Sequence, residues 1–188
     1  ELSGQDLDGF LVPLSDEHQS EFPPKRAQRL AWLTGFTGSA GIAVILKDKA
    51  ALFVDGRYTL QVREQAESEI YEFCSISDDP PGSWIVKNAP TGSRIGYDPW
   101  LHTQSGIAQL VEKCRAAQIH LVQVESNPLD QVWADQPPAP MAPVYPHPVD
   151  IAGRSAAEKI AEAAAVIQRH GAKAAVLTAP DSIAWLLN

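Results

Sequence analysis

Asp55-Gly56-Arg57 is the place in the sequence whose residue types best suit chemistry. The three residues follow an apolar run and precede a predicted helix, so their polar groups should emerge at the end of a strand, where binding sites often form. An arginine at such a corner offers a planar fork of N–H donors, which suits a carboxylate such as the C-terminus of a peptide. The alternative from the residues alone is that Arg57 pairs with Asp55, or with another acid, and braces the corner.

A glycine-rich segment, Thr34-Gly-Phe-Thr-Gly-Ser-Ala-Gly41, precedes this corner. It resembles a phosphate-binding loop, but no Gly-Lys-Ser/Thr follows, and the next element is predicted to be a strand rather than a helix. We therefore expect the glycines at 35, 38 and 41 to serve positive φ angles and close backbone approach beside a strand.

No other set of residues has the spacing of a catalytic or metal site. The histidines at 18, 102, 120, 147 and 170 are scattered through different predicted elements, without metal-ligand spacing. No serine lies in a Gly-x-Ser-x-Gly elbow. Cys74 and Cys114 fall on apolar positions, which favours buried free thiols over a disulfide. We expect no catalytic residue and no metal site in these 188 residues.

The composition limits the partners of the chain. The apolar fraction is 45%, the charged fraction 20% and the net charge −8, which is typical of a globular domain without a basic surface. Nucleic acids and anionic membranes are therefore unexpected partners. No apolar run approaches the roughly 20 residues of a spanning helix. Free thiols fit a cytoplasmic setting, although the chain begins at Glu1 rather than Met, so an upstream signal stays open.

Strand and helix signals alternate along the first 135 residues, which predicts an α/β domain with one mixed sheet flanked by helices. The Lys47-Asp48-Lys49 turn predicts an antiparallel hairpin inside that sheet. Another helix should bury Ile107, Leu110, Val111 and Cys114. The predicted strands are 9–14, 42–46, 50–54, 70–76, 94–97 and 119–124, and the other helices are 27–33, 58–66 and 83–88.

The composition changes after residue 135. Residues 136–150 are rich in proline, which predicts a semi-rigid, extended linker. Residues 151–188 then read as the first elements of a second domain. They comprise a helix that starts at a Ser155–Glu158 capping box and ends near Gly171, a strand at 173–178, and a helix from Asp181.

The order and spacing of several segments resemble the N-terminal region of three-domain aminopeptidase P, the Xaa-Pro aminopeptidase of the creatinase/prolidase (pita-bread) family. The segments are Asp16-Glu-His-Gln-Ser-Glu21, Gly35-Phe-Thr-Gly-Ser-Ala-Gly41, Asp55-Gly-Arg-Tyr-Thr-Leu-Gln61, Gly96-Tyr-Asp-Pro99, Asn127-Pro-Leu-Asp-Gln-Val-Trp133 and Asp181-Ser-Ile-Ala-Trp-Leu-Leu-Asn188. The resemblance implies a creatinase/prolidase N-terminal-type domain, plus the first elements of a second similar domain.

The resemblance also implies a function for the parent protein. It would be a homodimeric, cytoplasmic enzyme that releases the N-terminal residue preceding proline in peptides. Two divalent metal ions, usually manganese, would activate water in a pita-bread domain that these residues do not include. In that family the arginine of the Asp-Gly-Arg-Tyr segment, here Arg57, reaches toward the substrate. Asp16, His18 and Gln19 are expected only to brace a turn.

Two other interpretations stay open at this point. The chain could belong to a binding or scaffold module that keeps this fold without peptidase activity, because fold alone does not determine function. It could also come from a prolidase or a creatinase, which the extra domain expected after Pro148 disfavours.

Overall fold

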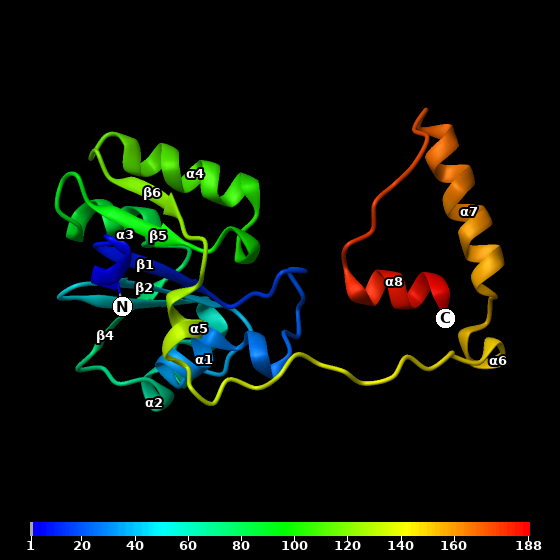
Figure 1. The fold of residues 1–188 in the computed structure, drawn as a ribbon, viewed down its shortest axis with the longest axis horizontal. Coiled ribbons are helices and arrows are strands. Elements are labelled where there is room, and N and C mark those ends of the chain that lie inside the picture. Colours follow the sequence, from blue (N-terminus) through cyan, green and yellow to red (C-terminus); the bar gives the residue numbers. More distant parts are fainter. Residues whose placement is uncertain (1) are drawn as a thin grey trace. The chain divides into compact units, whose positions relative to one another are not determined.

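The computed structural model describes residues 2–188 (Figure 1). The chain divides into two compact units, the first ending at Ala139 and the second beginning at Pro140. Within the described residues, no helix combines the length and apolar character needed to cross a bilayer.

A six-stranded mixed sheet forms the centre of the first unit, with strand order β4-β3-β2-β1-β5-β6. Strand β2 runs antiparallel to both of its neighbours, and the other strands share one direction. The mixed sheet and its internal hairpin, β2 with β3, confirm the predicted fold class. The strands are β1 (Gly9–Pro13), β2 (Gly41–Leu46), β3 (Ala50–Val54), β4 (Tyr71–Ser75), β5 (Arg94–Tyr97) and β6 (His120–Gln123).

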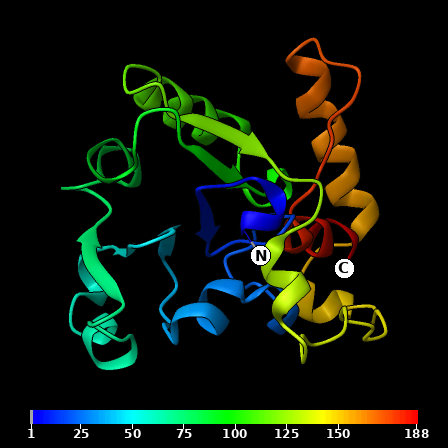
Figure 2. The ribbon, with the colours of Figure 1, turned by 60° about the vertical axis from the view of Figure 1, so that its left-hand side comes forward.

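Helices cover both faces of this sheet. Helices α1, α2 and α5 pack on one face, and α3 and α4 pack on the other; α4 and α1 lie on opposite sides of the sheet in both views (Figures 1 and 2). The helices are α1 (Arg29–Thr34), α2 (Gln61–Gln65), α3 (Pro81–Asn88), α4 (Gln104–Arg115) and α5 (Pro128–Val132). Short 3-10 helices occur at η1 (Leu2–Gln5), η2 (Lys25–Ala27), η3 (Gly56–Tyr58) and η4 (Pro99–Leu101).

The core consists of two layers, one on each face of the sheet. In β3, Leu52 and Val54 join the layer under α1 and α2, while Ala51 and Phe53 join the layer under α3. Because both faces are buried, the strand is apolar along its whole length rather than at alternate positions. Burial of a large apolar side chain stabilises the fold by about 1.5–3 kcal/mol, so these layers hold the strand ends in place.

Several helices differ from the sequence prediction: α1 covers Arg29–Thr34 rather than 27–33, and α5 was not predicted. α3 begins at Pro81 rather than at residue 83, because proline suits the first turn of a helix, where its missing N–H has no partner to lose. The helix expected over 58–66 is divided into η3 and the shorter α2. In α4, Cys114 is fully buried, but Val111 is 37% exposed, because this helix packs on α3 and the edge strand β6 and buries only a narrow stripe.

Polar and aromatic contacts, together called the latch, join Arg29 and Trp32 of α1 to Asp130, Trp133 and Gln136 near the end of the first unit. Arg29 donates to both carboxylate oxygens of Asp130 at 2.7 and 2.8 Å, and the Gln136 amide donates to the same carboxylate at 2.8 Å. Trp32 stacks on Trp133 with ring centroids 5.3 Å apart. Beyond these contacts, the Arg26 guanidinium donates to the carbonyl of residue 137. The chain therefore stays attached to the first unit through residue 137.

The second unit contains α6 (Val149–Ala152), α7 (Ala156–Arg169) and α8 (Pro180–Leu187). The capping box at the start of α7 is confirmed, since the Ser155 hydroxyl accepts from the Glu158 N–H and the Glu158 carboxylate accepts from the Ser155 N–H. Gly171 follows α7 with φ +69°, the left-handed geometry expected there. The buried Lys159 amine donates to the Trp185 carbonyl and the Asn188 side chain, which joins α7 to α8.

The strand predicted at 173–178 is wrong, because these residues form neither strand nor helix. A strand needs a neighbour for its backbone hydrogen bonds, and the described part of this unit offers none. Residues 138–148, in the proline-rich segment, are exposed and also form no helix or strand.

Candidate functional site

Loops that carry aspartates converge at one edge of the sheet. Strands β1, β3 and β5 run in the same direction, so the residues that follow them lie at the same, carboxyl edge. Asp16 follows β1, Asp55 follows β3 and Asp98 follows β5. The glycine-rich loop belongs to the same edge, because it precedes the antiparallel β2. Ligands of α/β sheets bind preferentially at such edges.

Asp55 and Arg57 form a closed pair at this edge. The Asp55 carboxylate caps η3 by accepting from the Arg57 N–H at 2.9 Å. It also accepts from the Arg57 guanidinium, from Nη2 at 2.6 Å and from Nε at 3.1 and 3.2 Å. The pairing expected of a bracing arginine is therefore present.

The guanidinium nevertheless keeps unused donors. The Arg57 side chain is 67% exposed, and within residues 2–188 no hydrogen bond is made by its Nη1. Its hydrogen bond to Asp55 raises the pKa of Arg57, and the same bond lowers the pKa of the Asp55 carboxyl. Both groups are therefore charged at neutral pH, and Nη1 can donate to a ligand.

The glycine-rich loop, residues 34–41, packs against Tyr58, the residue that follows Arg57. Gly35 ends α1 with φ +76°, and a Cβ on Gly38 would clash with the ring of Phe36 and lie 2.9 Å from Cδ1 of Tyr58. The expected uses of glycine thus divide between these two positions, one needing positive φ and the other close approach. The Tyr58 hydroxyl lies 2.6 Å from Ser39 Oγ, and this hydrogen bond lowers the pKa of Tyr58.

Sequence reasoning missed two contributors to this edge. It placed Tyr58 in a helix over 58–66, whereas Tyr58 lies in η3, makes an edge-to-face contact with Phe36 and has the Arg57 guanidinium 5.2 Å from its ring centroid. It also missed an exposed amide cluster, in which Gln61 and Gln65 bond each other and the Thr37 hydroxyl. The four-residue spacing of the two glutamines on a helix could have indicated that they meet, but nothing in the sequence indicates Thr37.

The turn at Asp16 has the bracing role that the sequence predicts. Asp16 is 2% exposed, and one of its carboxylate oxygens accepts from the N–H groups of His18 and Ser20 at 3.0 and 2.9 Å. Gln19 adopts φ +56° and donates from its N–H to the Asp16 carbonyl. These bonds use the carboxylate to shape the loop after β1.

No metal site is formed by the residues that the structure describes. Between residues 2 and 188, no group of three His, Cys, Asp or Glu side chains is arranged to hold an ion. Both cysteines are free, as expected, and burial raises the pKa of the Cys74 thiol to about 11.

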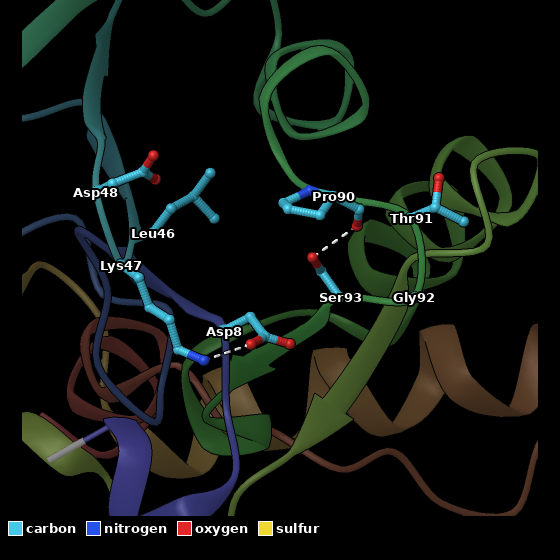
Figure 3. Close-up of a pocket in the computed structure, with 8 residues that line it drawn as sticks. All are labelled: Asp8, Leu46, Lys47, Asp48, Pro90, Thr91, Gly92 and Ser93. Atoms are coloured by element: carbon cyan, nitrogen blue, oxygen red, sulfur yellow. Dashed lines mark hydrogen bonds and ion pairs between the residues drawn. The ribbon is translucent and has the colours of Figure 1, made fainter.

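A polar pocket of about 460 Å³ lies at the opposite, amino edge of the sheet (Figure 3). Two of its polar side chains are already engaged, because Lys47 donates to Asp8 at 2.6 Å and Ser93 donates to the carbonyl of Pro90 at 2.6 Å. Asp8 precedes β1 and Ser93 precedes β5, so this pocket contributes nothing to the edge that carries Arg57.

Comparison with known proteins places this chain among peptidase relatives. Aminopeptidase P1 of Lotus japonicus is 38% identical over 183 residues, which are 97% of this chain and 28% of that protein. Xaa-Pro aminopeptidase 2 of Rattus norvegicus is 33% identical over 193 residues, covering all of this chain and 28% of that protein. The chain thus spans little more than a quarter of the length of these relatives.

Solved structures show the same relationship. The X-prolyl aminopeptidase of Caenorhabditis elegans, described as a cytosolic enzyme with a di-nuclear active site, matches 96% of this chain and 30% of its own, with a TM-score of 0.85 and 29% identity. The N-terminal domain of the cytoplasmic peptidase PepQ from Mycobacterium tuberculosis covers 70% of this chain with a TM-score of 0.54 and 20% identity, which shows the fold alone.

Family models agree with both comparisons. Residues 1–132 match a model described as the creatinase/prolidase N-terminal domain, and residues 135–188 match a second model with the same description. The first match alone covers more than half of the sequence. The chain therefore belongs to the creatinase/prolidase N-terminal domain family.

Proposed function

We propose that this chain is the non-catalytic N-terminal part of a metal-dependent Xaa-Pro aminopeptidase, which releases the N-terminal residue preceding proline in peptides. The observation that carries the proposal is the match of nearly the whole chain to proteins named aminopeptidase P and Xaa-Pro aminopeptidase. In this proposal, residues 151–188 begin a second creatinase-like domain, and residues 136–150 are the linker before it.

The metal ions of the proposed reaction belong to the catalytic part of the parent protein. The C. elegans neighbour is described as having a di-nuclear active site, and the residues described here do not fit a metal. We assign two divalent ions to the catalytic part of the parent protein, which lies outside these residues. The family resemblance suggests that the ions are manganese. The ions would supply activated water there, and this chain alone would be inactive.

The role of this chain would be to help shape the substrate site and the assembly of a cytoplasmic homodimer. Arg57 is the residue assigned to substrate. It lies at the carboxyl edge of the sheet, it is exposed, and its Nη1 is available to a peptide with proline at the second position. A peptide carbonyl or carboxylate could accept from it.

Substitution of Arg57 tests its assignment. In the full-length enzyme, Arg57→Ala should weaken peptide binding by roughly 1.5–3 kcal/mol, the usual range for a hydrogen bond to a charged group. The loss should appear in KM, measured by steady-state kinetics on an Xaa-Pro peptide. If KM stays unchanged while the melting temperature falls, Arg57 only braces the corner.

The activity itself is tested by comparing two proteins. The full-length protein should cleave an Arg-Pro-Pro-type peptide with added manganese, and a chelator should abolish the cleavage. The purified 188-residue chain should show no turnover under the same conditions. A full-length protein that binds but never cleaves such peptides would instead support a scaffold module of the same fold.

A further inference from the structure

The guanidinium of Arg57 is not a free cation, because Asp55 already neutralises it. Both carboxylate oxygens of Asp55 lie on one side of the guanidinium and accept hydrogen bonds from Nε and Nη2. What remains for a ligand is the opposite side, Nη1 together with the second N–H of Nη2. The geometry thus fixes which donors face outward and leaves the pair with no net charge.

A ligand at these donors meets Asp55 as well as Arg57. A second acid, Glu21, also lies close enough to Arg57 for its charge to act on the guanidinium. The charged groups that act on the Arg57 guanidinium therefore include two carboxylates, Asp55 and Glu21. For a ligand carboxylate, attraction to Arg57 is offset by repulsion from these acids. A neutral carbonyl escapes the repulsion and keeps the hydrogen bond.

We propose that Asp55 is a specificity-determining residue. Because of its charge, Arg57 binds main-chain carbonyl groups of the peptide and does not select C-terminal carboxylates. The inference rests on the proposed function, since it concerns how an Xaa-Pro peptide is held. A peptide whose free C-terminus lies at Arg57 then has no advantage over a peptide that continues past it.

The charge of Asp55 can be separated from its role as a helix cap. Asparagine caps helix starts about as well as aspartate, so Asp55→Asn keeps the acceptor for the Arg57 N–H while it removes the charge. Asp98→Asn is the matched control. Asp98 caps η4 by accepting from the Trp100 N–H at 3.0 Å, its other carboxylate oxygen accepts from the Asn127 amide at 3.0 Å, and no arginine in the described chain is hydrogen-bonded to it.

The experiment uses the full-length enzyme and pairs of Xaa-Pro peptides of increasing length, each made as a free acid and as a C-terminal amide. We expect the wild-type enzyme and Asp98→Asn to give nearly equal KM values for acid and amide at every length. Asp55→Asn should prefer the acid by about fivefold at the length whose terminus reaches Arg57, because hydrogen bonds between charged groups are roughly twice as strong as neutral ones. Adding Arg57→Ala should remove that preference.

Three results would overturn the inference. The first is a wild-type preference for acids that Arg57→Ala removes, and the second is an Asp55→Asn enzyme without acid preference at any length. Both leave the proposed function standing, because cleavage before proline continues. The third is a wild-type enzyme that cleaves no Xaa-Pro peptide, which removes the proposed function and the inference with it.

Discussion

The stability of the first unit should depend on pH through His102. This side chain follows η4, and its ring meets the ring of Tyr97 edge to face, with centroids 5.8 Å apart. Its Nε2 is covered by protein and has no hydrogen-bond partner within residues 2–188. Burial lowers the pKa of His102 from 6.5 to about 4, against a weaker opposing effect of the Asp98 charge.

The sign and size of the effect follow from proton binding. Between pH 6.5 and about 4, His102 binds a proton in the unfolded chain but stays neutral in the folded protein. Stability is therefore fully present above the unfolded pKa and falls as pH is lowered through this range. A gap of roughly 2.5 pH units at about 1.4 kcal/mol each gives an upper bound near 3.5 kcal/mol, and partial exposure of the ring reduces the expected loss to about 2 kcal/mol.

Denaturation at several pH values measures this loss. Urea unfolding of the wild type and of His102→Phe, followed by circular dichroism from about pH 7 down to about pH 4.5, gives the free energy of unfolding of each. The difference between the two proteins should shift by about 2 kcal/mol in favour of the variant, because phenylalanine keeps the ring and cannot titrate. Carboxylates with lowered pKa values, such as Asp16, act mainly at lower pH. Parallel profiles for the two proteins would refute the reasoning.

Three further predictions concern the latch, the linker and the second unit. Asp130→Asn should lower the free energy of unfolding by roughly 2 kcal/mol, because it leaves the largely buried Arg29 guanidinium without its charge partner; an unchanged urea midpoint would contradict this. A broad-specificity protease should cut first within 140–148 and spare residues 2–135, as mass spectrometry of the fragments would show; early cuts within 42–54 would mean that the core is assigned incorrectly. Ser155→Ala should destabilise α7 by about 1 kcal/mol, seen as a lower helix content on heating; an unchanged helix content would count against this role of the cap.

The sheet of the first unit was predictable because its strands depend on local pattern. Continuous apolar runs, such as Ala50 to Val54, indicate strands buried on both faces, and Lys47-Asp48-Lys49 indicates the hairpin. The second unit was less predictable. Residues 173–178 have the composition of a strand, but a strand depends on a partner that the sequence of these residues cannot supply.

The candidate site was predictable only in part. Asp55-Gly56-Arg57 indicated both a strand end and an ion pair, and the structure has both. The contacts of Tyr58 with Ser39 and Phe36 depend on how the glycine-rich loop and η3 meet at the carboxyl edge of the sheet. Such long-range contacts have no signature in residue spacing, since the loop and η3 are joined only through the intervening hairpin.

The latch between α1 and α5 also has a consequence for evolution and for engineering. The last described hydrogen bond of the linker to the first unit is the one from Arg26 to the carbonyl of residue 137, so residues inserted after Ala139 would interrupt no described hydrogen bond of that unit. Lengthening an exposed segment costs little, about 0.6 kcal/mol for each doubling of its length. The proline-rich segment is therefore where the length of the linker can vary among relatives without repacking of the core. A fusion partner could be introduced at the same place.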